Sequence, residues 1–157
     1  MRHGIWPALM LALAVAACGE TPAEAPAAEA GALTGVTVTQ GRLSLPPVKG
    51  NPAAVYFEIA NAGDKDLMIR AATVEGAAST QLHQMGTWNL QPSMDQLMQV
   101  PVPKGQTVKF APGGLHVMVY ELSDTLAAGG TTQVTLNLVG GETVTFPVEI
   151  RAAGDER

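Results

Sequence analysis

The stretch Leu115-His116-Val117-Met118-Val119 decides the fold, because branched apolar side chains alternate along it with a histidine and a methionine. Successive side chains of a β-strand point to opposite faces of the sheet. Leu115, Val117 and Val119 are therefore expected to point into a core, while His116 and Met118 project together from the other face. The segment predicts a strand that carries an imidazole and a thioether on one side.

Similar short runs, rich in Val, Thr, Ile, Leu, Tyr and Phe, lie on both sides of this segment. No long stretch has helical periodicity, so the pattern favours an all-β domain. Residues 61–64 and 111–114 supply the positive φ angles and the fixed proline φ that tight turns require. Eight or nine strands indicate a β-sandwich or Greek-key barrel. The predicted strands are residues 36–40, 54–60, 67–74, 80–85, 96–100, 106–110, 116–122, 131–138 and 143–150.

Residues 1–18 are interpreted as an export signal, with Arg2 as its positive start and an apolar stretch that is too short to span a bilayer as a helix. The sequence Val15-Ala16-Ala17-Cys18 resembles the lipobox of bacterial lipoproteins, which implies that Cys18 is lipid-modified and anchors the protein. The alternative is an ordinary signal peptide, with Cys18 removed or left as a free thiol. Both interpretations predict an exported protein, and we expect it on the periplasmic side of the bacterial envelope.

The remaining chain is expected to form a tether, one domain and a tail. Residues 19–32 are Ala, Pro, Glu, Thr and Gly without an aromatic residue, which is typical of a flexible tether. Residues 33–150 are long enough for a single hydrophobic core, and residues 151–157 form the tail. The net charge of -5 and the lack of a Lys/Arg cluster argue against a nucleic-acid partner. We expect a monomer that meets the membrane only through its lipid anchor.

Two histidines next to methionines are the main chemical clue. With His3 in the signal, only His83 and His116 remain, and Leu82-His83-Gln84-Met85 repeats the pairing of imidazole and thioether. Thioether sulfur favours Cu(I), and imidazole suits copper or zinc, so the mixed set points to copper. Calcium or magnesium would require carboxylates. Methionine also fills cores, so residue types alone leave a metal-free β module as the alternative.

The cysteine content limits the possible chemistry. Cys18 is the only cysteine, so one chain can form neither a disulfide nor a cysteine metal site. A blue-copper electron carrier needs a cysteine ligand with two histidines, and a hydrolase needs a nucleophile placed beside a base. Neither pattern is present, so the protein is predicted not to be an enzyme.

The spacing of four residues resembles the motif of the periplasmic copper chaperone family PCuAC, which is His, ten residues, Met, twenty-one residues, His, one residue, Met. His83, Met94, His116 and Met118 fit this spacing without a gap. The surroundings are also similar. They comprise Ala54-Val55-Tyr56-Phe57 leading to Asn61, Pro103-Lys104-Gly105-Gln106-Thr107-Val108 between the halves of the motif, and Pro112-Gly113-Gly114-Leu115 before His116. The likeness covers nearly the whole domain.

The resemblance implies a cupredoxin-like β-barrel that holds one Cu(I) ion through His83, Met94, His116 and Met118 and transfers it by ligand exchange. It also implies delivery to the dinuclear copper centre of cytochrome c oxidase, with a Sco-type assembly protein or the copper-bearing oxidase subunit as the partner. A copper-buffering lipoprotein would use the same four ligands without an oxidase partner. The sequence leaves these two roles open.

Two segments depart from what the family resemblance implies. The tail, residues 151–157, has neither the His nor the Met that form a second copper site in some members. Residues 88–93, which begin with Trp88, replace the acidic, glycine-containing loop of the family. Met85 is interpreted either as a spare sulfur beside the site or as a packing residue.

Overall fold

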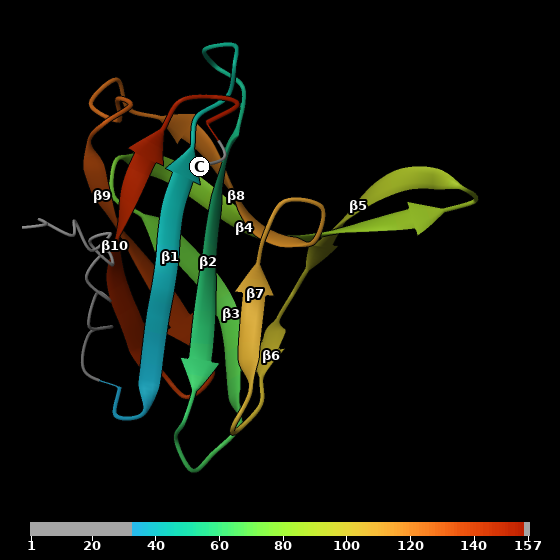
Figure 1. Cartoon of the computed structure of the whole chain (residues 1–157), viewed down its shortest axis with the longest axis vertical. Coiled ribbons are helices and arrows are strands. Elements are labelled where there is room, and N and C mark those ends of the chain that lie inside the picture. Colours follow the sequence, from blue (N-terminus) through green and yellow to red (C-terminus); the bar gives the residue numbers. More distant parts are fainter. Residues whose placement is uncertain (1–32, 156–157) are drawn as a thin grey trace, which may run out of the picture.

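The computed structural model describes residues 33–155, and all regular secondary structure in this range is β (Figure 1). The predicted all-β domain is therefore confirmed. None of the described residues forms a helix that could cross a membrane. The interpretations of residues 1–32 as signal, Cys18 anchor and tether lie outside the described residues. The strands are β1 (Val36–Ser44), β2 (Ala53–Asn61), β3 (Leu67–Val74), β4 (Ala77–Trp88), β5 (Gln91–Leu97), β6 (Val100–Val102), β7 (Thr107–Phe110), β8 (Leu115–Leu122), β9 (Thr131–Leu138) and β10 (Thr143–Arg151).

The ten strands form one hydrogen-bonded sheet in the order β5-β4-β8-β7-β2-β1-β10-β9-β3-β6. The sheet folds over on itself, so β1 and β2 lie in front of β3 and β4 in Figure 1. β1 runs parallel to β10, with Leu43 opposite Ile150, and antiparallel to β2. The hydroxyl of Thr80 donates a hydrogen bond to the carbonyl of Ala72, which joins β4 to β3 although these strands are far apart in the sheet order.

The core lies between the two layers, because alternate side chains of each strand point inward. β2 shows this most clearly, since every second residue from Ala53 to Asn61 is buried. The rings of Phe57 and Phe110 stack with centroids 4.3 Å apart, and Phe146 packs on Phe57 at 5.1 Å. Phe110 ends β7 directly before the turn that leads into β8. The aromatic cluster of the core therefore supports the start of β8.

The segment between β4 and β7 differs from the prediction. A strand over residues 96–100 is wrong, because the chain leaves β5 after Leu97 and begins β6 at Val100. β4 continues to Trp88, and Asn89 and Leu90 form a two-residue turn with φ angles of 49° and 63°. A type I′ hairpin turn requires positive φ at both central residues. β4 and β5 thus form a hairpin that projects from the body of the domain (Figure 1).

Candidate metal centre

β4 is the central strand of the candidate site, with β8 on one side and β5 on the other. Leu82 of β4 is buried in the core. Because strand side chains alternate, its neighbours Gln81 and His83, and then Met85, project from the opposite face. This outer face of β4, continued on β5 and β8, is called the His/Met face below.

β8 adds the second histidine to this face. His116 lies directly opposite His83 in the antiparallel pairing, and Met118 lies opposite Gln81. The two imidazole rings have centroids 5.8 Å apart and planes inclined by 52°. Val117 and Val119 point into the core and are fully buried, as their alternation predicted. The pairing places His83, His116 and Met118 on one face.

β5 brings Met94 to the same face. Met94 lies directly opposite Met85 in the β4–β5 hairpin, and Gln96 lies opposite His83. Met94 is therefore diagonal to His83, at a range that long side chains can bridge. Its side chain is 48% exposed, whereas Met85 is half-buried. The structure thus gathers all four residues of the motif, together with Met85, on three neighbouring strands.

His116 is held by the turn that precedes it. Its Nδ1 lies 3.0 Å from the carbonyl oxygen of Gly114, which also accepts the backbone N–H of Met85 at 3.1 Å. A carbonyl oxygen only accepts hydrogen bonds, so the proton of neutral His116 resides on Nδ1. The lone pair is therefore on Nε2. The side chain is only 5% exposed, and the ring of Tyr56 packs beside it with a centroid distance of 6.4 Å.

His83 has the opposite tautomer. Its Nε2 lies 3.0 Å from Oε1 of Gln81, and the hydroxyl of Tyr120 donates to the same oxygen at 3.1 Å. Since an amide oxygen is an acceptor, the imidazole proton resides on Nε2 and the lone pair on Nδ1. Nδ1 is buried and has no hydrogen-bond partner among the described residues. A buried nitrogen without a partner is unusual in a folded protein, so Nδ1 is a candidate position for an ordered water molecule or a metal ion.

The electrostatics keep His83 neutral. Burial lowers its pKa below the ordinary value of 6.5, and the neighbouring His116 lowers the pKa further by charge repulsion. At neutral pH the imidazole is therefore unprotonated on Nδ1. A metal ion at this nitrogen would displace no proton.

Sequence reasoning missed Gln81 and Tyr120, which orient His83. Both lie on the His/Met face, because Gln81 is two residues before His83 and Tyr120 is two residues after Met118. The same alternation that predicted the direction of His116 and Met118 could have found them. Metal-bound imidazoles commonly donate their second N–H to a carbonyl or carboxylate oxygen, which fixes the ring. Gln81 supplies that oxygen for His83, and the Gly114 carbonyl supplies it for His116.

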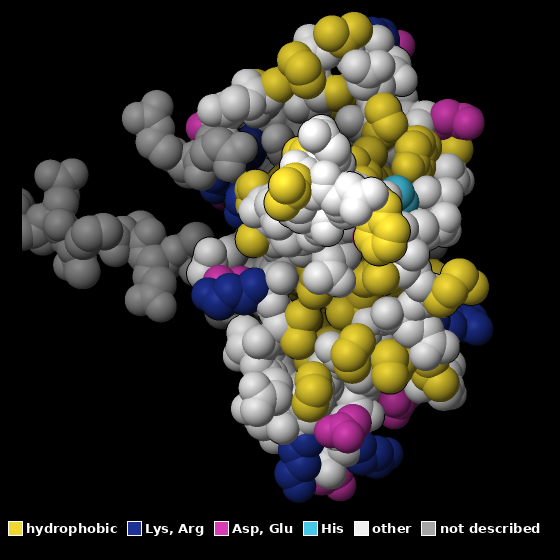
Figure 2. All heavy atoms as spheres, turned by 90° about the vertical axis from the view of Figure 1, so that its right-hand side faces the viewer, with side chains coloured by type: hydrophobic (Ala, Val, Ile, Leu, Met, Phe, Trp, Pro, Cys, Tyr) yellow, Lys and Arg dark blue, Asp and Glu magenta, His cyan; other side chains and the backbone are white. Residues whose placement is uncertain are grey.

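The donor atoms of the His/Met face suit a soft metal ion. Within residues 33–155, no three His, Cys, Asp or Glu side chains gather as a metal site. Two neutral imidazoles and the thioethers of Met85, Met94 and Met118 remain, and this combination favours Cu(I) over zinc, calcium or magnesium. In Figure 2 hydrophobic side chains surround a histidine beside the projecting hairpin. The site is an open face that another protein could approach.

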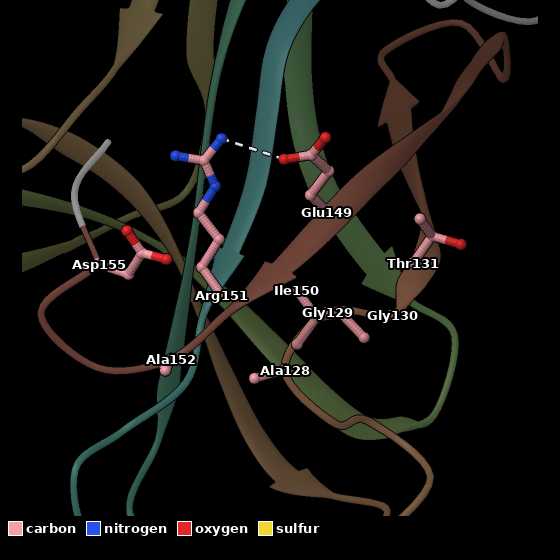
Figure 3. A pocket seen from close by; sticks show the side chains of 9 residues that line it. All are labelled: Ala128, Gly129, Gly130, Thr131, Glu149, Ile150, Arg151, Ala152 and Asp155. Carbon is pink, nitrogen blue, oxygen red and sulfur yellow. Dashed lines mark hydrogen bonds and ion pairs between the residues drawn. The ribbon is translucent and has the colours of Figure 1, made fainter.

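Two pockets elsewhere in the domain have no part in this face. Figure 3 shows the first, beside the end of β10, where Arg151 pairs with Glu149 at 3.0 Å between Nη2 and Oε2. The second lies near Leu45 and Leu126, with a 2.6 Å ion pair between Lys49 and Asp124 at its edge. Neither pocket is lined by a histidine or a methionine.

The fold is similar to that of solved PCuAC domains. The copper-bound PCuAC domain from PmoF2 has a TM-score of 0.64 and 20% identity, covering 78% of this chain and 97% of that one. The Cu(I) solution structure of DR1885 from Deinococcus radiodurans has a TM-score of 0.55 and 21% identity, covering 85% and 83%. The predicted cupredoxin-like β fold is therefore confirmed.

The family model described as "Putative lipoprotein LpqE-like" matches residues 36–150, so the chain belongs to the LpqE-like family. The matched range contains the whole His/Met face. A relative named "Putative lipoprotein Lxx21020", from Leifsonia xyli subsp. xyli (strain CTCB07), is 32% identical to this chain over 99 residues. These residues make up 62% of this chain and 60% of that relative.

Proposed function

We propose that this domain binds one Cu(I) ion through His83, Met94, His116 and Met118 and transfers it to another protein by ligand exchange. The observation that carries the proposal is the pair of imidazole lone pairs, on Nδ1 of His83 and Nε2 of His116, beside thioethers on the same face. Each imidazole is fixed by a hydrogen bond on its other nitrogen. The copper-bound structural neighbours support copper as the ion.

Neutral, soft ligands suit a carrier better than a permanent metal site. Four uncharged donors stabilise Cu(I) without supplying negative charge, so a partner's thiolate can compete for the ion. Thiolate ligands inside the carrier would bind more tightly, but in an oxidising compartment paired cysteines tend to form disulfides. Histidine and methionine ligands neither hold the ion too tightly for release nor form disulfides.

The exposure of the ligands suggests an order for the exchange. Met94 lies on the edge strand β5 and is 48% exposed, whereas His116 is 5% exposed. An incoming thiolate therefore meets Met94 first and His116 last. Met85, directly opposite Met94, offers a second thioether while Met94 is displaced. Ligands leave one at a time, and the ion does not pass through water.

The proposed recipient is a Sco-type assembly protein or the copper-bearing subunit of cytochrome c oxidase. The protein acts as a monomer on the periplasmic side of the envelope, attached to the membrane through lipid-modified Cys18. Membership of a lipoprotein family supports this anchor. The protein has no catalytic role in this proposal, since the copper is cargo.

The test is an anaerobic Cu(I) titration of the mature protein against a competing chelator. We expect tight binding of one ion in the wild type and at least a 100-fold weaker affinity in a Met94→Leu, Met118→Leu double variant, because leucine keeps the volume and removes the sulfur. Met68→Leu is the matched control, since Met68 lies on β3, opposite Pro101 of β6. Equal, weak binding in the wild type and the double variant would instead favour a metal-free β module.

Transfer needs its own experiment. Copper-loaded protein mixed with the candidate recipient should lose Cu(I) faster than it does to a chelator of the same affinity, because exchange is direct. A rate no higher than that to the chelator would favour copper buffering over delivery.

A further inference from the structure

The tip of the β4–β5 hairpin exposes two large apolar side chains. Trp88 is 75% exposed and Leu90 is 92% exposed. Leu90 adopts φ 63°, a left-handed conformation that glycine, asparagine or aspartate adopts more readily than leucine. The turn therefore keeps an apolar side chain at a position where a polar residue would fit the backbone better. The exposed leucine therefore indicates a role in binding rather than in the stability of the fold.

The hairpin is also free of charge. Residues 85–94 contain no Asp, Glu, Lys or Arg, although the whole chain has a net charge of -5. In Figure 2, which looks onto the hairpin, its surface is mostly hydrophobic or uncharged. Trp and Leu next to neutral amides, here Asn89 and Gln91, match the boundary between lipid headgroups and acyl chains. Tryptophan is enriched at this boundary because its ring is apolar and its N–H is polar.

We propose that the tip of the hairpin, residues 88–90, inserts into the surface of the lipid bilayer to which Cys18 is attached. The inference depends on the lipid anchor of the proposed function but not on copper. The 14 residues from 19 to 32 can span at most roughly 46–50 Å. A compact domain of this size is roughly 35 Å across, and the projecting hairpin adds to this length. The tip therefore reaches the membrane in orientations that bring Leu33 within about 50 Å of the membrane surface. Attachment also gives a high local concentration, so a weak contact suffices.

Insertion would fix the height of the His/Met face above the membrane. Met85 precedes Trp88 by three residues, which corresponds to about 10 Å along a strand. Met94, opposite Met85, would therefore lie about 10 Å above the inserted tip, and His83 with His116 opposite it about 17 Å above the tip. A membrane-bound copper recipient would meet Met94 nearest the membrane surface.

Trp88 itself reports the contact. The chain has two tryptophans, and Trp6 is lost with the signal, so Trp88 is the only one in the mature protein. The metal-free lipidated protein would be placed in phosphatidylcholine vesicles that contain brominated lipids. We expect Trp88 emission to shift to the blue and to be quenched by the brominated lipids, with at least twofold protection from iodide relative to N-acetyltryptophanamide.

Leu90→Asn is the matched variant, because asparagine keeps the left-handed turn and removes the apolar side chain. We expect it to reduce quenching by brominated lipids at least twofold, with an unchanged circular dichroism spectrum. If Trp88 of the wild type is not quenched by brominated lipids and is accessible to iodide, the proposal is overturned, and the tip would instead be explained by contact with a protein partner. Equal quenching in the variant would overturn it too. Mass spectrometry of the N-terminal peptide tests the anchor separately, and an unmodified Cys18 would remove the basis of the proposal.

Discussion

His83 and His116 face each other across β4 and β8, and each donates its one N–H to a protein oxygen. Because the donating nitrogen is Nε2 in one ring and Nδ1 in the other, the two free lone pairs are on different ring atoms. Both N–H groups are used by other oxygens, so neither ring donates a hydrogen bond to the other and both lone pairs remain available to an ion.

Cu(I) affinity should depend on pH through these imidazoles. Protons compete with the metal for a histidine lone pair, so affinity should be constant above about pH 7.5 and fall as the pH drops below about 6.5. Burial and repulsion from His116 lower the pKa of His83, so competition at this residue begins at a lower pH than for a free imidazole. A chelator calibrated at each pH provides the measurement. An affinity that is flat between about pH 5 and 8 would contradict a ligand set with two histidines.

Gln81 should position His83 for the metal. Gln81→Leu removes the oxygen that accepts Nε2–H, so we expect Cu(I) affinity to fall about 10-fold or more. Gln84→Leu makes the same change on the opposite face of β4 and should leave the affinity unchanged. Nitrogen-15 NMR of the metal-free protein gives an independent measurement, since it distinguishes the two tautomers of neutral histidine. An Nδ1–H tautomer of His83 in the wild type would contradict the assigned role of Gln81.

Gly113 should be required for the turn that supports His116. Its φ of 76° lies in the left-handed region, and no atom lies within 4 Å of where a β-carbon would be. The cost of Gly113→Ala therefore comes from the backbone alone, and we expect the free energy of unfolding to fall by about 1–2 kcal/mol. Gly113→Asn should cost less, because asparagine tolerates this conformation. Urea unfolding measures both, and equal effects of Ala and Asn would argue against this explanation.

Phe110 should contribute a large share of the stability. Its ring stacks on Phe57 at 4.3 Å, and both side chains are buried. Phe110→Ala should lower the free energy of unfolding by about 3–5 kcal/mol, out of a total of about 5–15 kcal/mol for a typical domain. Phe110→Leu keeps more of the apolar volume and should cost less. A loss below 1 kcal/mol in urea unfolding of Phe110→Ala would mean that the surrounding side chains fill the cavity.

The sequence was sufficient for much of the fold and for the direction of two motif residues. The alternation in Leu115-His116-Val117-Met118-Val119 predicted which side chains enter the core, and Val117 and Val119 confirm it. This pattern is reliable because one face of β8 is packed against the core, so a shift by one residue would expose the apolar set. The predicted turn over residues 111–114 is also present, with positive φ at Gly113.

The β4–β5 hairpin could not be predicted in the same way. Its strands project beyond the core, so no buried face imposes a strict alternation of apolar and polar residues. The turn at Asn89 and Leu90 lacks the glycine that usually marks a two-residue hairpin loop. The prediction therefore placed a strand too late, at residues 96–100. The sequence also could not show which nitrogen of each histidine carries the lone pair. This depends on the hydrogen-bond partners, which are Gln81 for His83 and the Gly114 carbonyl for His116.

The position of β5 at the end of the sheet has a consequence for self-association. An edge strand can pair with the same strand of another molecule, and lipid anchoring would confine copies of this protein to two dimensions, where they collide often. β5 contains Pro92, which has no N–H to offer, and Asp95, whose charge would be repeated in an approaching copy. These two residues oppose aggregation along the strand that carries Met94. The face can thus stay open for metal exchange without becoming a template for fibrils.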